Sequence, residues 1–350
     1  MIPDSILRWL RRRNVLVTGG TGMVGRQITR LACDAGACVR TASLDDLQVD
    51  PRAEHLLGDL TDPAFCRDAT RDMEIVFHVA GIKGSVEVTT RRPASFFVPL
   101  LLMNANLLEA SRRSGVRRLV FTSSIGAYPS REVFREADAW DGPPMDLFPG
   151  WAKRMGELQI EAYQREFGID TFAVVRLANV YGPGDSFDPA SAMVIPSLMS
   201  RVRRGEDPLV VWGDGSAVRD FVHSRDVAEG VVLALYHGSG PAPVNLGSGV
   251  GCSVAELVET LSRVVPFRYR FDATRPAGFP VRVMAIERAR DTLGWQPRTS
   301  LEDGLRETWD WFVAHEREFE HKQNYFAARS QGNAGGDRCC SFDEPRRAVP

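Results

Sequence analysis

The sequence contains very little lysine and has no surplus of positive charge. Only three of its 43 basic residues are lysine, namely Lys83, Lys153 and Lys322, and all the others are arginine. The 45 acidic residues leave a net charge of −2, whereas a protein that binds nucleic acid needs a basic face. The composition therefore argues against a nucleic-acid partner, and it makes each lysine worth examining.

The sequence also lacks the signals of membrane and secreted proteins. No run approaches the ~20 apolar residues that a membrane-spanning helix needs, and the opening MIPDSILRWLRRR lacks the apolar core and cleavage site of a secretory signal. The six cysteines show no CxxC spacing, which predicts buried or free thiols and no metal site. We expect a cytoplasmic protein without a membrane segment.

The first 180 residues alternate short β-branched runs with amphipathic stretches, which is typical of a parallel sheet with helical crossovers. We therefore expect an α/β fold with a Rossmann-type, doubly wound parallel sheet. The expected strands cover residues 14–18, 37–42, 74–80, 118–123 and 171–177, and the expected helices cover 25–35, 94–113 and 151–167.

Proline and glycine become more frequent after residue 180, which indicates a smaller lobe interleaved with the sheet. Further helices are expected at 190–204, 226–237, 253–264, 286–293 and 301–320, with a strand at 209–212. We expect an extension at 1–13, a Rossmann domain at 14–180 to which 221–250 returns, a lobe made of 181–220 and 251–320, and a disordered tail at 321–350.

A glycine pattern joins the first expected strand to the first expected helix. Its Gly-x-x-Gly-x-x-Gly spacing permits a tight turn and lets the backbone approach a pyrophosphate, which the helix N-terminus attracts. We expect this loop to bind NAD or NADP through Gly19, Gly22, Met23, Val24 and Gly25.

The sequence does not choose between the two dinucleotides. NAD-binding units commonly carry an acidic residue at the end of the second strand, where it holds the ribose hydroxyls. Here Ser43 stands near that point, Arg40 precedes it, and Asp45 and Asp46 follow it.

Two later segments complete the expected cofactor site. Asp59, followed by Leu60, either holds the adenine amino group or caps the next helix, and the residues alone leave both interpretations open. Ala80 and Gly81 end the strand that we expect to flank the pyrophosphate.

Several ordered motifs between residues 14 and 315 show a family resemblance. The chain resembles the extended short-chain dehydrogenase/reductases of the NAD-dependent epimerase/dehydratase family, which act on nucleotide sugars, and within them the GDP-L-fucose synthases. The motifs are the glycine loop, GDL at 58–60, FTSS at 121–124, AKRMGE at 152–157, NVYGPG at 179–184, VIP at 194–196, VWGDG at 211–215, RDF at 219–221, NLGSG at 245–249 and DATRP at 272–276.

The resemblance implies a catalytic Tyr-x-x-x-Lys pair with a nearby serine, in which the lysine holds the nicotinamide ribose and lowers the tyrosine pKa. Lys153 and Ser124 occupy the matching positions. The position four residues before Lys153 is Pro149, so the phenol is missing. Gly126 and Met193 stand where fucose synthases carry a cysteine and a histidine that act as acid and base in epimerisation.

Other positions follow from the same resemblance. Leu100 replaces an asparagine common in the superfamily. Segments 94–113 and 151–167 would build the four-helix bundle of a homodimer. Expected nucleotide-sugar contacts are Arg219 on the diphosphate, the further cations Arg201 and Arg275, and Asn179, Val194 and Trp212.

The missing phenol leaves two hypotheses. One is an NAD(P)-dependent nucleotide-sugar epimerase, reductase or dehydratase, with a GDP-sugar favoured and an atypical active site. The other is a catalytically impaired regulatory or partner subunit that still binds both ligands. Among candidate replacement acids, we interpret His223 as structural, and Asp185, Asp188 and Glu136 stay open.

Overall fold

The computed structural model describes residues 2–82, 84, 86–188, 192–238, 240, 242–275, 278–316 and 318. Lys83, Lys322 and the tail expected at 321–350 lie outside the described residues. The Rossmann-type fold predicted from the alternating pattern is confirmed by a seven-stranded parallel sheet. Its order is β12-β7-β5-β4-β1-β2-β3, formed by β1 (Asn14–Thr18), β2 (Cys38–Ser43), β3 (Glu54–Leu57), β4 (Ile75–His78), β5 (Arg118–Ser124), β7 (Phe172–Leu177) and β12 (Val244–Leu246).

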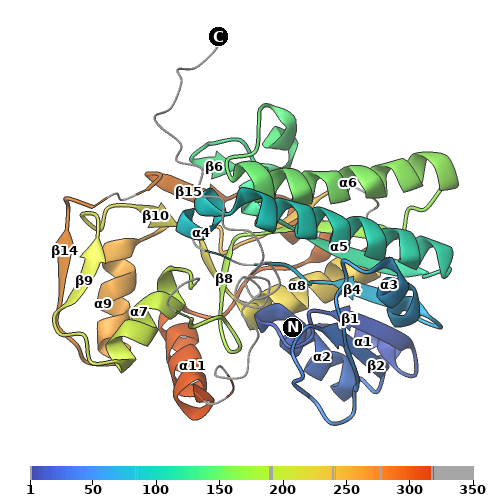
Figure 1. Cartoon of the computed structure of the whole chain (residues 1–350), viewed down its shortest axis with the longest axis horizontal. Coiled ribbons are helices and arrows are strands. Elements are labelled where there is room, and N and C mark those ends of the chain that lie inside the picture. Colours follow the sequence, from blue (N-terminus) through green and yellow to red (C-terminus); the bar gives the residue numbers. More distant parts are fainter. Residues whose placement is uncertain are drawn as a thin grey trace, which may run out of the picture.

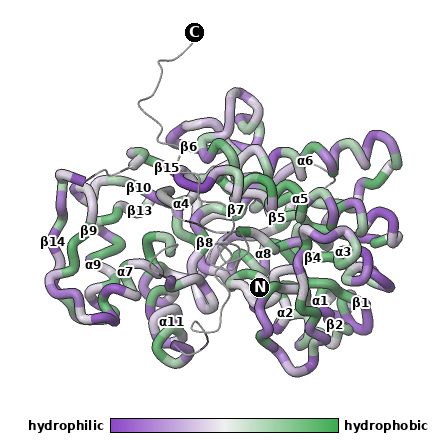
Figure 2. The backbone as a smooth tube through the Cα atoms, in the orientation of Figure 1, coloured by the Kyte–Doolittle hydropathy of each residue, from purple (hydrophilic) through white to green (hydrophobic). Residues whose placement is uncertain are grey.

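Helices cover both faces of this sheet (Figure 1). One face carries α1 (Asp4–Leu10), α2 (Met23–Asp34), α8 (Ser224–His237) and α10 (Glu287–Leu293). The other face carries α3 (Pro63–Thr70), α5 (Pro93–Arg113) and α6 (Leu147–Phe167). The strands between them are buried on both sides, as in parallel sheets generally, and hydrophobic residues concentrate there (Figure 2).

The sheet's core includes segments that the sequence assigned elsewhere. The expected N-terminal extension contains α1, whose Ile6 and Leu10 are buried in this core. Ala289, Leu293 and Trp295 belong to the same core, although residues 251–320 were expected in the lobe. The chain therefore returns to the sheet twice, through α8 with β12 and again through α10.

The lobe has its own apolar core between α7 (Val194–Arg203), α9 (Val254–Val264) and α11 (Leu301–Ala314). α11 ends at Ala314, before the expected end at 320. Its small sheets are β9 (Leu209–Trp212) with β14 (Tyr269–Asp272), β8 (Asn179–Tyr181) with β11 (Phe221–His223), and the order β13-β10-β15-β6 from β6 (Val133–Phe134), β10 (Val218–Arg219), β13 (Cys252–Ser253) and β15 (Val281–Met284).

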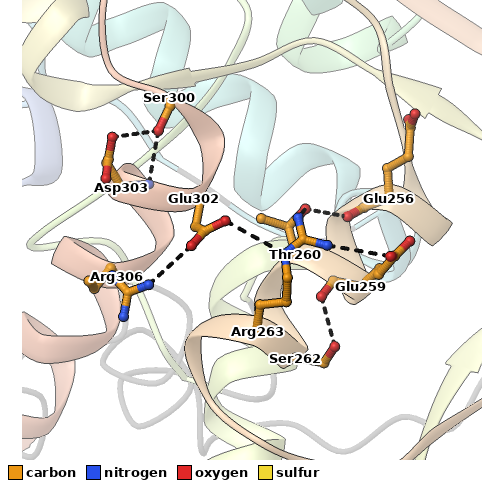
Figure 3. Close-up of polar contacts among 9 residues, drawn as sticks. All are labelled: Glu256, Glu259, Thr260, Ser262, Arg263, Ser300, Glu302, Asp303 and Arg306. Atoms are coloured by element: carbon orange, nitrogen blue, oxygen red, sulfur yellow. Dashed lines mark hydrogen bonds and ion pairs between the residues drawn. The ribbon is translucent and has the colours of Figure 1, made fainter.

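Polar contacts also join α9 to α11 at the surface (Figure 3). The Arg263 Nε lies 3.6 Å from the Glu302 carboxylate, which also accepts a hydrogen bond from the Arg306 guanidinium. Ser300 caps α11 by accepting from the Asp303 backbone N–H. Because exposed ion pairs contribute only about 0–1 kcal/mol each, the apolar core supplies most of the lobe's stability.

One described helix, α5, is long and apolar enough by composition to cross a membrane. The prediction from the sequence that no such stretch exists is therefore wrong. Half of its most apolar window is buried within the protein, where it packs against α3 and α6. This placement accounts for its apolar residues as those of a core helix.

Candidate active site

One large cavity lies at the carboxyl ends of the sheet strands, between the sheet and the lobe. This is where ligands bind in doubly wound α/β proteins. Its volume is about 1570 Å³, larger than the ~300–1,000 Å³ that one small ligand occupies. The cavity has room for a dinucleotide and a second ligand together.

The glycine loop forms one wall and fits a pyrophosphate. Gly19 has φ +67°, and a Cβ there would meet the Ala80 Cα at 2.8 Å. A Cβ on Gly25 would collide with the Gly19 backbone. Only glycine allows this approach of loop, strand and helix, which leaves backbone room in front of the α2 N-terminus.

The end of β2 presents a carboxylate toward this loop. The Thr21 hydroxyl donates to Asp45 at 3.0 Å, and the Thr21 backbone N–H donates to the Ser43 hydroxyl at 3.3 Å. Asp45 and Ser43 both line the cavity. Arg40 faces elsewhere: it donates to Glu54 at 2.7 Å and to two backbone carbonyls.

Asp59 and Leu60 line the cavity, as do Ala80 and Gly81. The interpretation of Asp59 as a helix cap is wrong, because Asp62 caps α3 by accepting from the Ala64 N–H. Asp59 instead accepts from the Thr61 N–H at 2.8 Å in a short turn.

Lys153 reaches into the cavity from α6. Its ammonium donates to the Thr122 carbonyl at 2.8 Å and lies 5.0 Å from the centre of the Phe121 ring. Burial lowers the pKa of Lys153 to about 8, and Glu157 opposes this shift. Ser124 lines the same cavity at the end of β5, so the structure brings the two expected catalytic residues together.

Pro149 lies in the first turn of α6, which begins four residues earlier than expected. The first four N–H groups of a helix have no partner within it, so proline here sacrifices no helical hydrogen bond. Neither Tyr128 nor Tyr181, the tyrosines of the neighbouring motifs, replaces the missing phenol. Tyr128 is buried, donates to Asn245 at 2.6 Å and does not line the cavity, and Tyr181 points toward the Leu301 carbonyl.

The other candidate acids divide into two groups. His223 and Glu136 do not line the cavity: the His223 ring accepts from the Arg225 N–H as the cap of α8, and Glu136 accepts from the Asn245 N–H. Burial also lowers the pKa of His223 to about 4. Asp185 and Asp188 line the cavity on the lobe side.

Two arginines stand side by side in the wall formed by the lobe. Arg219 on β10 is paired in register with Arg282 on β15, and both line the cavity. Burial, together with Arg282, lowers the pKa of Arg219. Two desolvated guanidinium groups at one place suit a diphosphate. Asn179 and Val194 line this region too.

Three expected substrate contacts lie outside the cavity lining. Arg201 instead binds Glu206 and the Val210 carbonyl. The central carbon of the Arg275 guanidinium lies 5.4 Å from the centre of the Trp212 ring. Trp212 is 58% exposed, and the Arg275 side chain is 59% exposed. Arg203 and Arg204, at the end of the same helix as Arg201, line the cavity in its place.

The sequence analysis did not single out two residues that line the cavity, Arg282 and Asp146. Arg282 had no motif to mark it. Asp146 lines the cavity beside Pro149, and its carboxylate lies where a side chain on Gly126 would be.

The model of the NAD dependent epimerase/dehydratase family matches residues 15–247. The chain belongs to this family. The prediction of a nicotinamide dinucleotide as cofactor is thereby confirmed.

Relatives include named nucleotide-sugar enzymes. The chain is 31% identical to a GDP-L-fucose synthase of Sinorhizobium fredii, over 87% of this chain and 96% of that protein. It is also 31% identical to a dTDP-4-dehydro-6-deoxy-D-allose reductase of Streptomyces, over 89% and 99%. Among solved structures, MoeE5 in complex with UDP-glucose and NAD is 28% identical with a TM-score of 0.73, over 86% and 99%.

Proposed function

We propose that the protein is a nucleotide-sugar epimerase or reductase acting on an NDP-hexose, with a GDP-sugar favoured. The observation on which this rests is that one cavity is lined both by the glycine loop, Ser124 and Lys153 and by the paired cations Arg219 and Arg282. The dinucleotide, when bound, supplies or accepts a hydride. Ser124 would hold the reacting sugar oxygen, and the Lys153 ammonium would stabilise negative charge on it.

The cofactor is NAD in this proposal. An NADP site needs a cation for the 2′-phosphate, whereas an acidic residue favours the free ribose hydroxyls of NAD. Here Asp45 lies at that end of the cavity, and Arg40 is held away by Glu54. We favour a GDP-sugar because GDP-L-fucose synthases are among the relatives of the chain.

Cofactor oxidation tests both statements. Purified protein given a GDP-linked 4-keto-6-deoxyhexose should oxidise NADH at least about tenfold more efficiently than NADPH, since one lost charged contact costs about 1.5–3 kcal/mol. Asp45→Ser should reduce the preference for NADH over NADPH. Asp46→Ser, the matched control, should leave this preference unchanged. Equal use of both cofactors would contradict the role of Asp45.

The catalytically impaired binding subunit is the second candidate. Three observations favour it: Pro149 replaces the phenol, and Gly126 and Met193 replace the expected acid and base. Tight binding of NADH and the nucleotide sugar by calorimetry, with no turnover of any kind, would select it.

The protein forms a homodimer through α5 and α6 in our proposal. These helices pack side by side and expose Val98, Leu102 and Leu158, each at least 40% exposed. Two such helix pairs, one from each protomer, would bury these three side chains in a four-helix bundle. Light scattering should give a dimer, and Val98→Asp with Leu102→Asp should give a monomer. Val313→Asp, on α11, is the control, and a monomeric wild type would contradict the proposal.

A further inference from the structure

Asp146 is placed as a helix cap but does not act as one. It is the N-cap residue of α6, a position where an aspartate normally accepts from the backbone N–H of the second or third helical residue. The side chain of Asp146 makes no capping hydrogen bond. The third helical residue is Pro149, which has no N–H to donate.

The carboxylate instead fills space that Gly126 leaves open. A Cβ built on Gly126 would overlap Oδ2 of Asp146 and lie 2.9 Å from its Cγ. The backbone supports this approach, because the Asp146 N–H donates to the Gly126 carbonyl at 3.3 Å. The Gly126 N–H in turn donates to the Ser124 hydroxyl at 3.1 Å, so the carboxylate and Ser124 flank the same short turn.

The surroundings of this carboxyl group favour proton transfer. Its side chain is 44% exposed, and it lines the cavity. Partial desolvation raises the pKa of the Asp146 carboxyl group above its ordinary value, while the Arg282 guanidinium, with one nitrogen 3.8 Å from the carboxylate, opposes the shift. The turn at 124–128 that packs against it carries no charged residue, and Lys153 lies on the same helix as the cap.

We propose that Asp146 is the proton-transferring group of this active site. Its carboxylate occupies the space that a side chain at position 126 would fill. This proposal rests on the proposed function. The carboxylate takes the proton from the carbon next to a 4-keto group. The C–H electron pair forms a C=C bond as the carbonyl pair moves onto oxygen, where Ser124 and Lys153 stabilise the charge. Return of the proton to carbon restores the ketone, so no oxidant or reductant is consumed.

The test is exchange of hydrogen for deuterium at the carbons flanking the keto group. The full chain is incubated in D₂O with a GDP-linked 4-keto-6-deoxyhexose and no reduced cofactor, and the sugar is followed by NMR. Wild type should exchange these positions, and Asp146→Asn should do so about 10²-fold more slowly, the lower end of what acid–base catalysis contributes. Asp141→Asn, exposed in the same loop, is the matched control.

Further readouts separate a chemical role from a structural one. Asp146→Asn should keep the wild-type melting temperature and sugar affinity, and the inflection that the carboxyl gives to the pH profile of exchange should disappear. Gly126→Ala keeps the aspartate but fills its space, so it should also slow exchange.

Unchanged exchange in Asp146→Asn would overturn the proposal, as would a wild type that binds the sugar without exchanging it. If the wild type binds the sugar without exchanging its hydrogens but still oxidises NADH in its presence, the proposed function would hold and only the role of Asp146 would fall. Failure to bind either ligand by calorimetry would overturn both.

Discussion

Replacing Lys153 with methionine should lower turnover about 10³-fold and yet make the protein more stable at neutral pH. Turnover falls because the ammonium is the cation next to Ser124, and a preorganised charge of this kind is worth orders of magnitude in rate. The variant should also bind NADH more weakly in a calorimetric titration. Arg165→Met, which removes an exposed cation from the same helix, should change neither property.

The stability gain follows from the depressed pKa of the lysine. Burial lowers the pKa of Lys153 from 10.5 to about 8, so below pH 8 the folded protein holds a charged group that it disfavours. Between pH 8 and 10.5 the unfolded chain binds more protons, and stability therefore rises with pH in this window. Methionine removes the unfavourable desolvation of the ammonium but also loses the hydrogen bond to the Thr122 carbonyl. The free energy of unfolding should therefore rise by about 2 kcal/mol at pH 7.

Thermal unfolding at several pH values measures this effect. The difference in melting temperature between Lys153→Met and wild type should be positive at pH 7 and should shrink as the pH approaches 10. A variant that is less stable at pH 7 would contradict the argument that the ammonium is desolvated in the absence of ligands.

The parts of the site that depend on local sequence were predictable. The glycine spacing of residues 19–25 predicts a turn between a strand and a helix, and the family resemblance of the segment at 152–157 singles out Lys153. Both signals lie within a few residues of the group that they position. The carboxyl ends of parallel strands then bring them to one edge of the sheet.

The contacts that give the site its distinct character are not local. Arg282 joins Arg219 only because β15 pairs with β10, and no spacing in the sequence encodes that register. Asp146 meets Gly126 because the segment between β5 and α6 leaves the sheet through β6 and returns. In the sequence, Gly126 indicates only that a reactive side chain of the fucose synthases is missing. In the structure, the absence of a side chain at this position makes room for the Asp146 carboxylate.

Restoring the phenol by Pro149→Tyr should raise the rate of 4-keto-sugar reduction about 10³-fold, within the range that a placed general acid contributes. Residues four apart lie on one face of a helix, so the tyrosine would stand beside the Lys153 ammonium, which lowers its pKa. Pro149→Phe is the matched control, because it adds the ring without the hydroxyl. Stopped-flow oxidation of NADH measures the rate, and equal rates in the two variants would contradict the prediction.

The same substitution should have the opposite effect on deuterium exchange. Tyrosine at position 149 returns a backbone N–H to the third position of α6, and an aspartate at the N-cap readily accepts from that group. Asp146 would then turn from the cavity toward the helix, and both Pro149→Tyr and Pro149→Phe should exchange the sugar protons more slowly than wild type. A gain in reduction with a loss in exchange is the result expected if Pro149 and Gly126 together place the carboxyl group of Asp146 in the cavity.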